Sequence, residues 1–212
     1  MKIGVFDLET RNWSDDVPGG SSNIQAFRMS LGVLNDRVYW EDEVSLLLSH
    51  LRACDLIVGF NLINFDYVVL QRYRPDFDFG SLPTFDILQD LTQRLGHRVS
   101  LDSLCEGTLE TRKSGTGKKA VKWWREKKVQ KLAAYCKRDV NLTKQIFEVG
   151  LRSRYLRFMS HGFHDDGRRT VRTDHWPDAL SLCIKTSPQD AGKVFREDDI
   201  WTGLTQLKIS TP

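Results

Sequence analysis

The sequence predicts an α/β protein in which helices flank a mixed β-sheet. Short apolar runs with strand character occupy much of the first forty residues. After them, helical patterns alternate with further short apolar runs, an order typical of a sheet covered by helices. The chain has 212 residues, of which 40% are hydrophobic, and this suits one domain with an ample core.

The elements of the first half are expected from their apolar runs and from the turn residues between them. Asn35-Asp36 separates two apolar runs and is typical of a tight hairpin turn. The expected strands lie at about residues 2–8, 25–34, 37–40, 55–59 and 84–87, and the expected helices at about 42–53, 64–73 and 88–95.

The second half begins with helical patterns and then changes character. Helices are expected near residues 100–109, 119–126 and 129–149. Beyond Gly150, two alternating segments with Asp165-Asp166-Gly167 between them predict a β-hairpin. Residues 177–212 have weak periodicity and one possible helix near 178–184. We therefore expect a domain over residues 1–150 and an extension over 151–212, made of the hairpin and an unassigned tail.

Asp7 and Glu9 stand two residues apart in the first strand, within the run Ile3 to Thr10. Successive strand side chains alternate between the faces of a sheet, so both carboxylates point to the same side. Two like charges side by side are costly unless something positive lies between them. A hard divalent cation such as Mg²⁺, which takes oxygen ligands, would relieve this repulsion.

Two further motifs carry carboxylates. Asp66 follows Asn61 and Phe65 where an apolar strand passes into a helix, and free N–H groups at a helix start favour a negative charge there. Tyr135 and Asp139 are four residues apart in the helical stretch 129–149, so they share one helix face.

Together these motifs resemble the three exonuclease motifs of the DEDD 3′–5′ exonuclease superfamily, and Tyr-x-x-x-Asp is similar to its tyrosine branch. Asn-x-x-x-Phe-Asp resembles the proofreading exonuclease domain of family B DNA polymerases. Lys122-Trp123-Trp124, ahead of the third motif, is similar to stand-alone or helicase-associated predicted exonucleases. The resemblance covers about residues 1–150 and implies a ribonuclease H-like fold with this order of strands and helices.

The resemblance also implies an activity, which is hydrolysis of phosphodiester bonds from the free 3′ end of single-stranded DNA or RNA. Two divalent ions, Mg²⁺ or Mn²⁺, would serve as cofactors, and a polymerase or helicase could deliver the strand. Tyr135 would orient the attacking water, and Thr10, Asn61 and Phe65 would line the pocket for the terminal nucleotide. The metal ligands implied are Asp7, Glu9, Asp66 and Asp139.

Basic residues crowd the segment between Thr111 and Arg138, which contains eleven lysines and arginines and one acidic residue, Glu126. Interleaved with Trp123 and Trp124, these charges suit a polyphosphate strand with stackable bases. We expect phosphate contacts from Lys118, Lys119 and Lys122, next to a glycine-containing loop at residues 114–117. The alternative is a solvated helix face with both tryptophans packed in the core.

Other features bound the function. No apolar stretch is long enough for a membrane span, and the four widely spaced cysteines suit reduced thiols in the cytoplasm. Two alternatives to an exonuclease remain at this stage. One is a catalytically silent nucleic-acid-binding module on the same fold, and the other is a ribonuclease H-like endonuclease. The preserved carboxylates disfavour the first, and the Tyr135/Asp139 pair with the Asn61 motif disfavours the second.

Overall fold

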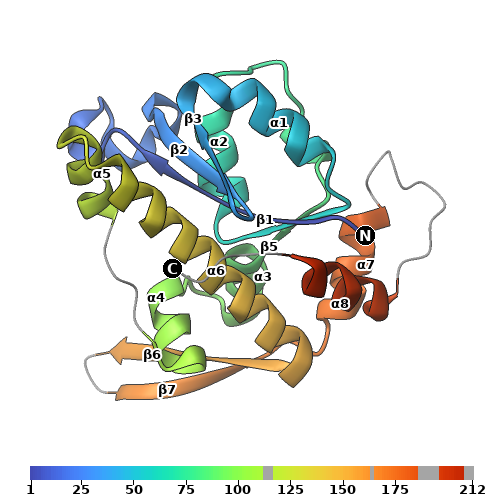
Figure 1. Cartoon of the computed structure of the whole chain (residues 1–212). Helices are drawn as coiled ribbons and strands as arrows, with labels where there is room; N and C mark the ends of the chain where they lie inside the picture. The colour runs from blue at the N-terminus through green and yellow to red at the C-terminus, as the bar shows by residue number, and fades with distance from the viewer. Residues whose placement is uncertain (112–116, 163–164, 186–195, 208–212) are drawn as a thin grey trace.

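Five strands form one mixed sheet in the computed structural model, which describes residues 1–111, 117–162, 165–185 and 196–207 (Figure 1). The strand order is β3-β2-β1-β4-β5. Pairing is antiparallel between β1 and β2 and between β2 and β3, and parallel between β1 and β4 and between β4 and β5. The prediction of a mixed sheet flanked by helices is confirmed. The strands are β1 (Ile3–Thr10), β2 (Met29–Leu34), β3 (Arg37–Trp40), β4 (Leu56–Gly59) and β5 (Thr84–Asp86).

Alternate residues of β1 face different helical layers. Phe6 and Leu8 are buried against α1 (Val44–Arg52) and α2 (Tyr67–Gln71). Val5 is buried on the other side, against α6 (Val129–Ser153), the long helix that crosses the sheet in Figure 1. Because strand residues alternate with a period of two, Asp7 and Glu9 lie on the α6 side, beyond Val5.

Three predicted elements differ in detail. The strand expected from residue 25 begins at Met29, because β1 pairs with β2 only as far as Thr10↔Met29. Before it, Ile24–Ala26 form a 3₁₀ turn. In place of the helix expected at 64–73, the chain forms a π-helical turn, Leu62–Asp66, followed by α2. In place of the helix expected at 100–109, it forms α4 (Leu101–Leu104) followed by a second π-helical turn, Cys105–Leu109. The other helices of this part are α3 (Ile87–Leu95) and α5 (Gly117–Arg125).

The chain after α6 packs onto the same side of the sheet as that helix. β6 (Tyr155–Gly162) and β7 (Asp165–Arg172) form the predicted antiparallel hairpin, but Asp165, Asp166 and Gly167 belong to β7, because the pairing continues to Gly162↔Asp165. Two helices follow, α7 (Trp176–Lys185) and α8 (Glu197–Gln206), and the second was not predicted. Trp176 is fully buried against Gly150, where a Cβ atom would collide with the indole ring.

All four cysteines lie in the described part of the chain, and none of them forms a disulfide there. Cys54, Cys105 and Cys136 are buried free thiols, and Cys183 is partly exposed. Within the described ranges, no helix combines the length and the apolar character that crossing a membrane would need.

Candidate metal centre

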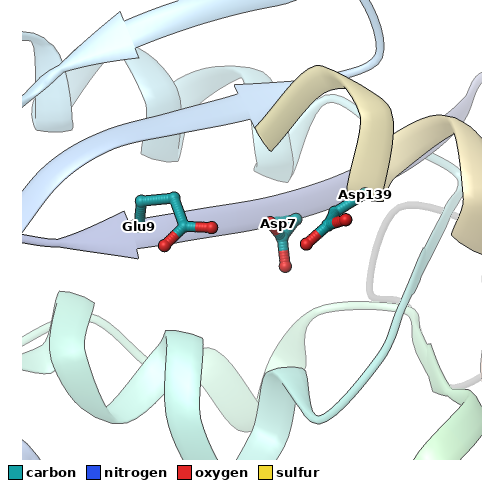
Figure 2. A group of neighbouring side chains, drawn as sticks. All are labelled: Asp7, Glu9 and Asp139. Atoms are coloured by element: carbon teal, nitrogen blue, oxygen red, sulfur yellow. The ribbon is translucent and has the colours of Figure 1, made fainter. Parts of the chain in front are cut away.

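Three acidic side chains from β1 and α6 meet on one side of the sheet. Asp7, Glu9 and Asp139 each offer a carboxylate oxygen, and these oxygens all lie within 4.8 Å of one another. Figure 2 shows the two side chains of the strand on the face over which α6 places Asp139. Asp139 is only 3% exposed, whereas Asp7 and Glu9 are partly buried. A set of carboxylate oxygens this close together fits a hard divalent cation, which takes oxygen ligands.

The packing of α6 on β1 brings these side chains together. Leu132, Cys136 and Val140 share a buried cluster with Val5, so one face of the helix lies against the strand. Asp139 lies three residues after Cys136 on this face. The contact is therefore built by apolar side chains, and the carboxylates occupy its open end.

Cys136 is a site residue that the sequence did not reveal. Its Sγ lies 3.3 Å from Oδ2 of Asp7 and 3.5 Å from the Asp7 carbonyl oxygen, as a hydrogen-bond donor to both. Burial, followed by the charge of Asp7, raises the pKa of Cys136, so the thiol stays protonated and keeps its donor. The sequence did contain one indication of this role, since Cys136 precedes Asp139 by three residues and so lies on the same helix face.

Tyr135 lies one turn before Asp139 and is 5% exposed. The ring of Trp123 packs edge-on against it, with 5.7 Å between ring centroids. Burial raises the pKa of Tyr135, and the charges of Asp139, Glu9 and Asp7 and a hydrogen bond with Asp139 raise it further. The phenol is therefore neutral at physiological pH and acts as a hydrogen-bonding group.

Asp66 joins the site from the neighbouring loop, at the end of the π-helical turn. Its Oδ1 accepts a hydrogen bond from the backbone N–H of Leu8 at 2.9 Å. Burial raises the pKa of Asp66 most, the charge of Asp7 raises it further, and the Leu8 hydrogen bond opposes both. Three of the four predicted ligands, Asp7, Glu9 and Asp139, therefore lie together. The fourth, Asp66, is outside that group but close enough to Asp7 to interact with its charge.

Asp86 holds the turn that carries Asn61. Asn61 has a left-handed backbone, with φ of 71°, and its N–H donates to Oδ1 of Asp86 at 2.8 Å. The other oxygen of Asp86 accepts from the N–H of Ile63 at 3.0 Å, and Oδ1 also caps α3 through Leu88. Asp86 is a further site residue outside the predicted motifs, although a carboxylate directly between a strand and a helix is typical of an N-cap.

The residues predicted for the terminal nucleotide do meet. Thr10, Asn61 and Phe65 line a cavity of about 380 Å³, the aromatic cavity, together with Trp13, Phe27 and Arg98 among others. Phe65 is partly exposed and lies edge-on to Phe27, with 6.0 Å between ring centroids. An adjoining carboxylate cavity of about 510 Å³ is lined by residues that include Asp7, Phe60, Asn61, Arg98, Ser100 and Leu101.

The predicted phosphate-binding lysines lie on α5, outside these two cavities. Lys118 and Lys122 line a third cavity, of about 490 Å³, and Lys118 lies over the Trp13 ring at 5.4 Å. Lys122 pairs with Glu126 at 3.7 Å, and Lys119 is exposed.

The two tryptophans of α5, Trp123 and Trp124, pack inward against the buried cluster between α6 and the sheet. That arrangement agrees with the core interpretation of the two tryptophans. Arg112, Lys113 and most of the predicted loop at 114–117 lie outside the described residues.

The chain was compared with protein-family models and with curated proteins. No family model matches it, and no curated protein matches it. The candidate site therefore rests on the geometry of its side chains and on the motifs in which they occur.

Proposed function

We propose that this protein is a metal-dependent 3′–5′ exonuclease that hydrolyses single-stranded nucleic acid on a ribonuclease H-like fold. The observation that carries the proposal is the group formed by Asp7, Glu9 and Asp139, with Tyr135 one helical turn from Asp139. The strand order β3-β2-β1-β4-β5, with β2 antiparallel to both neighbours, is compatible with that fold.

Asp7, Glu9 and Asp139 would hold the divalent ion, Mg²⁺ or Mn²⁺, and Asp66 would join them beside Asp7 as a ligand to a second ion. When bound, such ions supply a water that ionises near neutral pH and a positive charge opposite the leaving oxygen. The burial of Asp66 supports its part in this assignment, because a charged carboxylate is costly to bury and a cation next to it offsets that cost.

The side chains of the protein then have distinct tasks in hydrolysis. The water oxygen forms a bond to phosphorus, and the bond between phosphorus and the 3′-oxygen of the preceding nucleotide breaks. One proton leaves the water, and the departing 3′-oxygen takes up a proton. Tyr135, neutral because burial and the neighbouring carboxylates raise its pKa, would orient the water by a hydrogen bond rather than act as the base.

The aromatic cavity begins where β1 ends, since Thr10 is the last residue of the strand and lines the cavity. Its Phe65 and Phe27 rings suit the flat face of an unpaired base, whereas Asn61 and Thr10 offer hydrogen bonds to the sugar or the base. A terminal nucleotide seated there would place its phosphate toward Asp7. The 3′ to 5′ direction itself comes from the resemblance of the three motifs to DEDD exonucleases.

A nuclease assay on strands labelled at the 5′ end tests this proposal. Single-stranded DNA and RNA of matched sequence are incubated with Mg²⁺ or Mn²⁺, with a chelator as the control. We expect a ladder that shortens stepwise from the 3′ end and that is abolished by the chelator and by Asp7→Asn. Cuts at internal positions would instead indicate an endonuclease, and binding without cleavage would indicate a silent binding module.

A further inference from the structure

Arg98 lies at the boundary between the aromatic cavity and the carboxylate cavity. Two residues, Asn61 and Arg98, line both of them. The first cavity contains the rings of Phe65 and Phe27, and the second contains Asp7 of the acidic group. Any ligand that occupies both cavities must therefore pass Asn61 and Arg98.

The side chain of Arg98 is held at this boundary by a supported partner. Its Nη2 donates a hydrogen bond to Oδ1 of Asn61 at 3.0 Å. Asn61 is itself fixed, because its backbone N–H is bonded to the buried carboxylate of Asp86. The guanidinium is thus positioned by a residue whose backbone is anchored, although Arg98 as a residue is exposed.

The guanidinium keeps most of its binding capacity in this position. Arginine has five N–H donors, and the bond to Asn61 uses one of them. Across the described part of the chain, no carboxylate forms an ion pair with Arg98, unlike Arg28 and Arg154, which pair with glutamates. A fork of free donors with a full positive charge matches the oxygens of a phosphate group.

We propose that Arg98 binds the phosphate group of the nucleotide whose base occupies the aromatic cavity. This inference rests on the proposed function and extends it to a residue outside the three sequence motifs. In the exonuclease that phosphate is the one attacked by water. The carboxylates of Asp7, Glu9 and Asp139 repel a phosphate, and the positive charge of Arg98 at the boundary offsets this repulsion.

Two ligands that differ only in the phosphate test the assignment. Binding of deoxyadenosine 5′-monophosphate and of deoxyadenosine is measured by calorimetry with Mg²⁺ present, and neither ligand contains a phosphodiester bond to hydrolyse. For Arg98→Ala we expect monophosphate binding to weaken by about ten- to a hundredfold, and nucleoside binding by less than about twofold. Arg98→Lys should lie between wild type and Arg98→Ala, because it keeps the charge and loses the fork.

Arg74→Ala is the matched control, since Arg74 is a partly exposed arginine that lines neither cavity and pairs with Asp76. It should leave both affinities unchanged. Equal weakening of both ligands by Arg98→Ala, no weakening of either, or no binding of either by wild type would each overturn the assignment. This test does not depend on nuclease activity. If the wild-type protein did not cleave nucleic acid, the effect of Arg98→Ala on monophosphate and nucleoside binding could still be measured.

Discussion

Oδ1 of Asp66 accepts a hydrogen bond from the backbone N–H of Leu8 at 2.9 Å, which ties the second carboxylate motif to the middle of the first. β4 pairs with β1 only as far as Val5↔Val58, so the N–H of Leu8 lies beyond the end of that ladder. Asp66 supplies the acceptor that the strand no longer provides. Because Leu8 stands between Asp7 and Glu9, this bond also sets the position of Asp66 relative to both.

Asp66→Asn should stabilise the metal-free protein near neutral pH. Burial and the charge of Asp7 raise the pKa of Asp66, so the folded state binds this proton more tightly than the unfolded state does. Stability from this group therefore falls as pH rises from the unfolded pKa, about 3.9, through the higher folded pKa. Asparagine cannot ionise, and its carbonyl oxygen can still accept from Leu8.

Urea or thermal unfolding in the presence of a chelator, at pH 5 and pH 8, measures this effect. We expect the thermal midpoint of Asp66→Asn at pH 8 to exceed that of wild type by about 2–4 °C for each kcal/mol of desolvation cost that is removed. The gain at pH 5 should be smaller. Equal shifts at the two pH values would contradict a raised pKa of the buried Asp66. The same substitution should lower nuclease activity.

Asp139→Ala should impair metal binding and strongly lower activity while the fold persists. The side chain contributes an oxygen to the acidic group and is not part of the apolar contact between α6 and β1. Loss of about 3–4 kcal/mol of transition-state stabilisation corresponds to roughly 10²- to 10³-fold in rate. Mn²⁺ should raise the thermal midpoint of wild type and not that of the variant. Near-normal activity in Asp139→Ala would refute the site.

Cys136→Ala should weaken metal binding, and Cys136→Ser should restore it. The thiol donates to Oδ2 of Asp7, and groups that orient a metal ligand in this way contribute about 10-fold or more to affinity. Serine keeps a donor at the same place, whereas alanine removes it. Mn²⁺ titration by calorimetry compares the two variants. If both lowered the affinity equally, the cause would be altered packing of the helix rather than the missing donor.

Tyr135→Phe should lower the rate of the chemical step about 10-fold and leave substrate binding nearly unchanged. The ring, with its edge contact to Trp123, survives, and only the hydroxyl near the carboxylates is removed. Single-turnover kinetics and a separate measurement of strand binding distinguish the two effects. Tyr39→Phe, a buried tyrosine bonded to His50 on the other face of the sheet, is the control. An unchanged single-turnover rate in Tyr135→Phe would assign the hydroxyl a structural role.

Replacing Lys118 and Lys119 with glutamine should weaken strand binding more at low salt than at high salt. For a single strand, the slope of log affinity against log salt becomes shallower by about 0.7 for each phosphate that the protein no longer neutralises. Lys122 and Lys128 already pair with Glu126, so their joint replacement should change the slope less. Anisotropy of a labelled oligonucleotide over a range of salt concentrations measures both. Unaltered slopes in both variants would mean that the strand enters by another route.

Much of the fold follows from local patterns. The apolar runs and turn residues of the first hundred residues predicted all five strands of the sheet, and the errors lie at the ends of elements. Met29, for example, begins β2 because the partner strand ends opposite it, and this is a long-range property. The helix at 197–206 was not predicted, because Ile200 and Leu204 have helical spacing but are too few to give a clear periodic signal. What stabilises this helix is a long-range contact, the packing of its apolar residues near Ile3 around Gly203.

The candidate site divides in the same way. Alternation along a strand determined that Asp7 and Glu9 share a face, and helical spacing determined that Tyr135 and Asp139 share another. Only the packing of α6 on β1 placed those two faces together, across more than a hundred residues of chain. The roles of Cys136, Asp86 and Arg98 also depend on tertiary packing. Their roles are contacts with residues distant in sequence, and chain folding rather than local spacing decides which distant groups become neighbours.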